Sequence, residues 1–139
     1  MSLLFLLDSN ILSDPLRANP SERVLKRLER RPETLATASP VWHEMNFGCA
    51  RLPDSRRRRT IESYLERIVR GTLPILPYDT KAAEWHARER ARLEARGRTP
   101  PFVDGQIAAI AVVNNLTLVT DNGADFSNFR NLRIENWHA

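Results

Sequence analysis

The amino-acid sequence predicts an α/β fold: a single three-layer α/β/α domain with a central, mainly parallel sheet. Short apolar runs alternate with amphipathic helical patterns along the chain, which is the order that helical crossovers between parallel strands produce. The chain has 139 residues, close to the commonest size of one domain. No repeat, linker or low-complexity segment divides it, so we expect one domain over residues 1–139.

The elements of the first half are predicted from apolar runs and helix caps. A short continuous apolar run is typical of a buried strand, and a capping residue followed by proline is typical of a helix start. We therefore expect a strand over Leu3–Leu7, a helix from an Asn19 cap to about Arg30, a strand over Thr34–Ala38, a helix begun by Ser39-Pro40 and a helix over Ile61–Val69 ended by Gly71.

The second half continues the alternation. The segment from Ile107 to Val113 is apolar almost all round, which predicts a helix packed deep against the sheet. In order, we expect a strand over Leu73–Leu76, a helix capped by Asp79 or Thr80 that reaches Gly97, a helix from Phe102, a strand over Leu116–Thr120, a turn at Asn122-Gly123 and an edge strand over Leu132–Ile134.

Acidic residues stand where these elements meet. Asp8 and the Asp121-Asn122 pair follow predicted strands, and Glu44 and Asp104 lie near helix starts. The carboxyl ends of parallel strands share one edge of a sheet, where open α/β sheets bind ligands. Carboxylates gathered there repel one another, and Mg²⁺ or Mn²⁺ is the natural compensating cation because both prefer oxygen ligands.

A site of this kind could orient a phosphodiester and activate an attacking water. Each acid alone has an ordinary structural explanation as a helix cap or a surface charge, so the inference depends on their joint arrangement. The expected roles are Asp8 and Asp104 as direct ligands and Glu44 as a ligand or water-positioning group. Asp121 or Asn122 is expected as an outer oxygen donor, and the expected supporting groups are Ser9, Asn10, Thr120 and Asp121.

The charge balance favours a polyanionic partner. The formal net charge is +4 and the pI is about 10. The densest basic run is Arg56-Arg57-Arg58-Arg59, and Arg51 shares a helix stripe with Glu44 and Gly48. A solvated helix face explains the run equally well, so RNA contacts by these arginines are a weak expectation.

Several classes of protein are disfavoured. The apolar runs are shorter than the roughly 20 residues of a membrane helix, and the N-terminal run has no basic segment before it, so we expect a cytoplasmic protein without membrane contact. The single Cys49 makes no internal disulfide, and the three histidines lack the spacing of a zinc site.

Four motifs carry a resemblance to a known family. They are Asp8–Ser13, Trp42–Met45 with Gly48, Phe102–Ala109, and Leu116–Asn122 with Asp125-Phe126, followed by a closing Trp137. Together, in this order and spacing, they resemble the PIN domain, and within it the VapC and FitB-type toxins. Each motif alone is weakly specific, but the match covers nearly the whole chain.

The resemblance implies a metal-dependent endoribonuclease that acts as the toxin of a type II toxin–antitoxin pair. A small VapB-type antitoxin would neutralise it by placing its tail in the active site, the toxin would form a homodimer, the metal would be Mg²⁺ or Mn²⁺, and the substrate would be RNA such as tRNA or ribosomal RNA. By motif position, Asp8, Glu44 and Asp104 take the three core acidic roles.

The fourth acidic position departs from the family pattern. Two residues after Thr120 stands Asn122, with Asp121 and Asp125 on either side. We expect Asn122 first and Asp125 second to fill it. A neutral amide there would leave the metal held mainly by three carboxylates. Ser9 stands where the family often has threonine, and the hydroxyl is kept.

Other functions fit the sequence less well. A receiver-like phosphoacceptor module also clusters acids around Mg²⁺, but it resembles a chain with a late lysine, and the lysines here are Lys26 and Lys81. A haloacid-dehalogenase-type phosphatase would have an acid where Asn10 stands. A pure RNA-binding module would expose stacking aromatics, whereas the aromatics here, 7% of the chain, sit mostly in core-like places. A flap-endonuclease-type DNA nuclease uses similar carboxylates but is usually larger.

Overall fold

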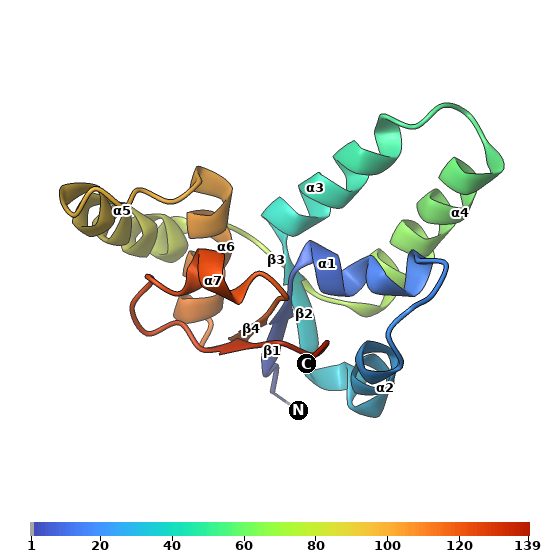
Figure 1. Ribbon diagram of the computed structural model, residues 1–139, viewed down its shortest axis with the longest axis horizontal. Helices are drawn as coiled ribbons and strands as arrows, with labels where there is room; N and C mark the ends of the chain where they lie inside the picture. Colours follow the sequence, from blue (N-terminus) through green and yellow to red (C-terminus); the bar gives the residue numbers. More distant parts are fainter. Residues whose placement is uncertain (1) are drawn as a thin grey trace.

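A computed structural model describes residues 2–139 (Figure 1). Its centre is a five-stranded sheet with strand order β3-β2-β1-β4-β5, in which every neighbouring pair is parallel. This confirms the predicted fold class. The strands are β1 (Phe5–Leu7), β2 (Leu35–Ala38), β3 (Ile75–Leu76), β4 (Thr117–Val119) and β5 (Ile134–Glu135).

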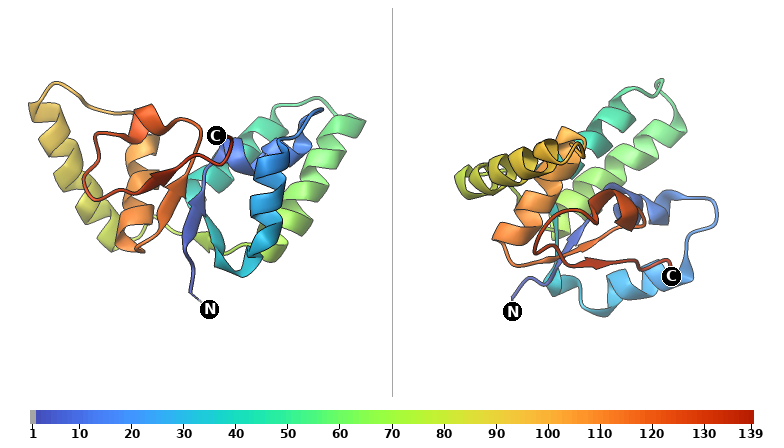
Figure 2. Two further views of the ribbon diagram at one scale, coloured as in Figure 1. Left: turned by 60° about the horizontal axis from the view of Figure 1, so that its bottom comes forward. Right: turned by 60° about the vertical axis from the view of Figure 1, so that its left-hand side comes forward.

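Helices cover both faces of this sheet. Figure 2 shows α5 and α6 on one side of the strands and α2 and α4 on the other. The helices are α1 (Ser9–Leu12), α2 (Glu22–Arg30), α3 (Ser39–Ala50), α4 (Arg56–Tyr64), α5 (Thr80–Ala95), α6 (Phe102–Val113) and α7 (Gly123–Phe126), with short 3-10 turns η1 (Asp14–Leu16) and η2 (Pro32–Thr34) and the π-helical η3 (Leu65–Arg70), which continues α4.

The core forms where the central strands meet α6. Leu6 of β1 and Leu118 of β4 are paired in the sheet and fully buried. From α6, the run Ile107–Ala111 is buried as well. Burial of this apolar surface drives folding, and it also fixes β1 and β4 side by side. Their carboxyl ends therefore lie at one edge of the sheet.

The helix boundaries correct two predictions. Ser21, not Asn19, caps α2: its hydroxyl accepts a bond from the Val24 N–H at 3.3 Å. Ser21 itself has an extended backbone, and its N–H donates to the Asp14 carboxylate at 2.8 Å. Helix α3 has Ala38 at its N-cap position without a side-chain cap bond, so Ser39 is its first residue and not its cap.

The strands and the last loop also differ from prediction. Each strand is shorter than its predicted range, although backbone hydrogen bonds continue beyond some strand ends, for example from the Leu4 N–H to the Thr34 carbonyl at 2.8 Å. Asn122-Gly123 is not a simple turn: Asn122 lies at the N-cap of α7, and its carbonyl accepts from the Asp125 N–H at 3.0 Å. The last strand lies at Ile134–Glu135, beyond the predicted Leu132 start.

The four-arginine run belongs to the start of α4, several residues before the predicted helix. Ser55 caps this helix by accepting from the Arg58 N–H at 3.2 Å. In Figure 1, the start of α4 lies at the outer end of the α3–α4 hairpin, away from the strand ends.

Two aromatic residues depart from the expected core positions. Phe47 on α3 is 55% exposed and Phe102 at the start of α6 is 52% exposed. Most other aromatics pack in or against the core, as predicted. Along residues 2–139, no helix has both the length and the apolarity that crossing a bilayer requires.

Candidate functional site

Asp8 is the buried centre of the candidate site. It follows β1 directly, and its own N–H donates to the Val119 carbonyl of β4 at 3.0 Å. One carboxylate oxygen accepts from the Ser9 N–H at 2.8 Å, and the other accepts from the Thr120 hydroxyl at 2.9 Å. Sequence neighbours and a residue from β4's end thus hold this carboxylate in one orientation.

Asn10 and Thr120 join the two strand ends. The Asn10 amide donates to the Thr120 hydroxyl oxygen at 3.2 Å and lies 3.4 Å from the Asp8 carboxylate. Its carbonyl oxygen accepts from the Asp121 N–H at 3.2 Å, and the Asn122 N–H donates to the Thr120 hydroxyl oxygen at 3.1 Å. The residues predicted to support the site therefore join the segment after β1 to the segment after β4 by hydrogen bonds.

Glu44 reaches this cluster from α3. It lies in the second turn of the helix, as predicted, and its carboxylate accepts a short hydrogen bond from the Ser9 hydroxyl. Ser9 thus connects the two acids, donating its N–H to Asp8 and its hydroxyl to Glu44. Glu44 is exposed, so its side chain is free to approach a ligand in solvent.

The pKa values of two of these acids are raised. Burial raises the pKa of Asp8, and the charges of Glu44 and Asp121 raise it further, against the lowering effect of its hydrogen bonds. Partial burial raises the pKa of Asp104, and the charges of Asp125, Asp8 and Glu44 act in the same direction. These charge effects have the sign expected of carboxylates that lie near one another.

The three residues competing for the fourth position lie in different places. Asp125, on the exposed side of α7, acts on Asp104, whereas Asp121 acts on Asp8. Asn122 contacts the loop through its backbone, and its side chain makes no cap bond to α7. The electrostatics therefore associate Asp125 with the Asp104 side of the site and Asp121 with the Asp8 side.

Behind Asp104 lies a buried histidine that the sequence reasoning missed. A Cβ atom on Gly105 would lie 2.1 Å from His86 Nε2, so this position of α6 requires glycine. His86 is buried on α5, its Nδ1 is hydrogen-bonded to the Tyr78 hydroxyl at 2.8 Å, and burial lowers its pKa. The glycine next to Asp104 was the available signal, since it marks a close approach between helices.

A second missed group joins the C-terminal segment to the site. Asp14 is fully buried and accepts from His138 Nε2 at 3.2 Å and from the Ser21 N–H at 2.8 Å. The other ring nitrogen of His138 lies 3.7 Å from the Asp121 carboxylate. Hydrogen bonds from Ser21 and His138 outweigh burial and lower the pKa of Asp14. Nothing in the local sequence around Asp14 pointed to this contact.

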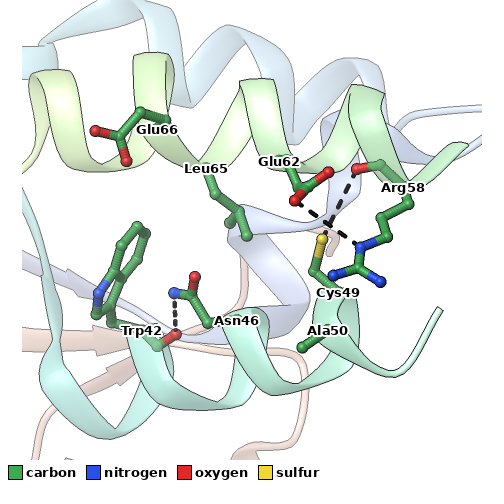
Figure 3. Close-up of a pocket in the computed structure, with 8 residues that line it drawn as sticks. All are labelled: Trp42, Asn46, Cys49, Ala50, Arg58, Glu62, Leu65 and Glu66. Atoms are coloured by element: carbon green, nitrogen blue, oxygen red, sulfur yellow. Dashed lines mark hydrogen bonds and ion pairs between the residues drawn. The ribbon is translucent and has the colours of Figure 1, made fainter. Parts of the chain in front are cut away.

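The predicted basic residues are not gathered at the acids. Arg58 donates to the Leu52 carbonyl at 2.9 Å, and Arg59 pairs with Asp54 at 3.1 Å. A hollow of about 320 Å³ lies between α3 and α4, and Figure 3 shows the side chains that line it. There Arg58 lies 3.9 Å from Glu62, and the Cys49 thiol is 3.8 Å from the Arg58 carbonyl. Of the predicted site residues, only Arg58 lines it.

The donor set fits a hard divalent cation in its chemistry. It consists of carboxylates, hydroxyls and one amide, all oxygen donors of the kind that Mg²⁺ and Mn²⁺ accept, and its acids repel one another without a counter-charge. Within residues 2–139, no three His, Cys, Asp or Glu side chains are arranged as a ready ligand group. A cation would therefore have to draw in Glu44 and Asp104, and the metal stays a prediction.

Comparison with known proteins assigns the family. An α/β sheet with acids gathered at its carboxyl edge defines a class of ligand-binding α/β domains. Within that class, residues 5–132 match the family model described as PIN domain. The chain belongs to the PIN domain family, which confirms the resemblance seen in the four sequence motifs.

Individual proteins of known name or structure are similar to nearly the whole chain. The chain is 32% identical to Toxin FitB of Neisseria gonorrhoeae over 89% of this chain and 92% of that protein. It is 29% identical to the tRNA(fMet)-specific endonuclease VapC of Salmonella typhimurium over 97% of this chain and 98% of that protein. Among solved structures, that of FitAB bound to an IR36 DNA fragment superposes on this chain with a TM-score of 0.89 and 27% sequence identity. The superposition covers 98% of this chain and 96% of the other.

Proposed function

We propose that this protein is a metal-dependent endoribonuclease and the toxin of a VapBC-type toxin–antitoxin pair. The observation that carries the proposal is the contact of Ser9 with both Asp8 and Glu44 beyond the end of β1. The raised pKa of Asp104, to which the charges of Asp8 and Glu44 contribute, supports it. The relatives named as a toxin and as a tRNA endonuclease support the same function. Neutralisation by a small VapB-type antitoxin is part of the proposal and follows from the resemblance to VapC and FitB-type toxins.

Asp8, Glu44 and Asp104 would hold Mg²⁺ or Mn²⁺ in this mechanism, with Asp125 as the outer oxygen donor. Asp125 is preferred to Asn122 because its charge already acts on Asp104. When bound, the cation lowers the pKa of an attacking water and stabilises charge on the phosphodiester oxygens. Thr120 and the Ser9 N–H keep the Asp8 carboxylate aimed at the site.

The Ser9 hydroxyl has a separate role in the proposal. By donating to Glu44, it orients a carboxylate that is otherwise exposed and free to rotate. An oriented Glu44 is placed to accept a hydrogen bond from the attacking water or to ligate the cation. Positioning of this kind raises the reaction rate because the reacting groups are already correctly oriented before the reaction.

The test is cleavage of total cellular RNA by purified protein with Mg²⁺ or Mn²⁺, with EDTA controls and the new ends mapped by sequencing. We expect discrete cuts from the wild type and none from Asp8→Asn or Asp104→Asn. Glu84→Gln, which removes an exposed acid from α5, is the matched control and should cleave normally. Cuts that persist in EDTA, or in both site variants, would contradict the proposal.

A further inference from the structure

Helix α2 carries a row of positive charges on the side that faces the C-terminal segment. Arg23, Lys26, Arg27 and Arg30 are spaced at i, i+3, i+4 and i+7, so they follow one face of the helix over about 10 Å. Together with Asn136, Trp137 and Ala139 they line a hollow of about 450 Å³. We call these four cations the α2 row.

Three of these four charges have no acidic partner within residues 2–139. Arg27 is paired with Glu135 at 3.2 Å, whereas the ion pairs of the described residues include none with Arg23, Lys26 or Arg30. All three of these side chains are exposed. Lys26 and Arg30 are spaced at i, i+4, where like charges destabilise a helix, so an anionic partner would relieve their repulsion.

The row begins beside the candidate site and leads away from it. Ser21, the cap of α2, donates its N–H to Asp14, and the Asp14 carboxylate also contacts His138. The other ring nitrogen of His138 lies 3.7 Å from the Asp121 carboxylate. After α2 the chain passes through η2 and enters β2 at its amino end, and Figure 1 shows α2 next to the C-terminal end of the chain. A polymer held at the acids therefore reaches the row by following the surface of the protein.

The row matches the phosphates of an RNA strand and offers little to its bases. The planar guanidinium of arginine and the ammonium group of lysine are the side-chain groups that bind phosphate oxygens. Trp137, the aromatic residue of the lining, is 3% exposed and lies under the Arg27 guanidinium at 4.6 Å, so a base has no open ring face to stack on. Phosphate contacts hold a strand in place without reading its sequence.

An acidic protein segment fits the same surface less well. The energetic centre of a protein interface is usually an aromatic or aliphatic anchor that seats in a pocket, with charged groups at the rim. Here the cations are exposed and the Trp137 ring is buried beneath them. RNA is also the partner that the acids themselves would hold in the proposed function, so a single molecule could occupy both surfaces.

We propose that the α2 row binds the phosphate backbone of the RNA substrate on one side of the cleavage position. The inference rests on the ribonuclease function proposed above and adds a second, sequence-independent contact to it. Part of the RNA affinity would then come from a surface that carries none of the acids of the site. That part is lost as the salt concentration rises, because added salt opposes the release of counterions from the RNA.

The test measures binding of a fluorescent oligouridylate by anisotropy over a salt series. All proteins carry Asp104→Asn so that the probe stays intact. The α2 variant combines Arg23→Gln, Lys26→Gln and Arg30→Gln. Each phosphate contact contributes about 0.7 to the slope of log Kd against log salt for a single strand, so the α2 variant should have a slope lower by about 2. Between about 50 and 200 mM salt, the parent should therefore lose roughly 20-fold more affinity than the variant.

The matched control removes the same charges from the opposite side of the sheet, where Figure 2 shows α5. Lys81→Gln, Arg88→Gln and Arg96→Gln also replace one exposed lysine and two exposed arginines, so both variants have the same net charge. The control should keep the slope of the parent. An equal loss of slope in both variants would show that net charge alone matters and would overturn the inference. Lys26→Gln alone should lower the slope by about 0.7, which tests the row even if the triple variant fails to fold.

Failure of the inference and failure of the proposed function give different results. A wild type that cleaves total RNA, combined with an unchanged slope in the α2 variant, overturns the α2 row alone. A wild type that neither binds the probe nor cuts total RNA overturns both. A labelled oligoglutamate, tested on the same proteins, reports the other class of partner. If the α2 variant loses affinity for oligoglutamate but keeps the RNA slope of the parent, the row belongs to an acidic protein segment and the inference is overturned.

Discussion

Replacing Gly105 with alanine should destabilise the protein, although a glycine inside a helix is normally unfavourable. The new Cβ would lie 2.1 Å from His86 Nε2 and 2.6 Å from its Cδ2. Optimal contacts between heavy atoms are roughly 3.5 Å or more, so the ring has to move by more than an ångström. Overpacking a core site costs about 1–3 kcal/mol.

His86 cannot give way freely. It is 2% exposed, bonded to the Tyr78 hydroxyl and packed against the Phe102 ring at a centroid distance of 4.7 Å. Breaking the bond to Tyr78 and leaving a buried group unpaired adds about 1–3 kcal/mol. Alanine recovers about 1 kcal/mol of helix propensity. The expected net loss in the free energy of unfolding is therefore roughly 1–5 kcal/mol.

Urea unfolding monitored by circular dichroism measures this loss. Gly48→Ala on α3 is the matched control, because nothing lies within 4 Å of its added Cβ. That variant should gain about 0.5–1 kcal/mol. In a His86→Ala background, Gly105→Ala should cost much less, since the clashing ring is gone. Equal stability of Gly105→Ala and wild type, or an unchanged cost without His86, would refute the reasoning.

Three further predictions concern charge. Asp104 has a raised pKa in the folded protein, so its ionisation lowers the stability of the wild type as the pH rises above the pKa of the unfolded state. In EDTA at neutral pH, Asp104→Asn should therefore have a higher melting temperature than the wild type, and this difference should be absent at low pH. An unchanged or lower melting temperature at neutral pH would contradict this. The Arg92 side chain lowers the pKa of Glu89, so Glu89→Gln should lose about 1–3 kcal/mol in urea unfolding at neutral pH, and the difference from wild type should shrink as pH falls through the Glu89 pKa. A difference that is the same at acid pH would count against this pair. Replacing Arg56 and Arg57 with glutamine should weaken RNA binding and reduce its salt slope without changing metal binding, as measured by anisotropy over a salt series and by calorimetry. An unchanged slope would exclude this end of α4 from the RNA interface.

The order of elements was predictable because it depends on local patterns. Runs such as Leu116–Thr120 have too few residues for a helix and too many apolar side chains for a loop, and their alternation with helical patterns leaves a parallel sheet as the natural arrangement. The ends of the elements were not predictable to the residue. Asn19 looks like a helix cap in sequence, but Ser21 is the cap, and its N–H is bonded to Asp14, seven residues earlier.

The acids of the candidate site could be proposed for the same reason, since each one follows a strand or lies near a helix start. Their supports divide into two kinds. Asn10 and Thr120 lie next to motif residues and were expected to contribute. His86 and His138 act from distant parts of the chain, and contacts between distant residues leave no mark in a local pattern.

The bond between Asp8 and Thr120 has a consequence for how the protein is made. These two residues are separated by 112 positions, and Thr120 follows β4, which pairs with β1 in the finished sheet. A ribosome adds about 5–20 residues per second, so the partner of Asp8 is synthesised roughly 6 to 20 s after Asp8 itself. The Asp8–Thr120 bond and the pairing of β1 with β4 are therefore absent from the nascent chain for most of its synthesis, and the candidate site is completed only near its end.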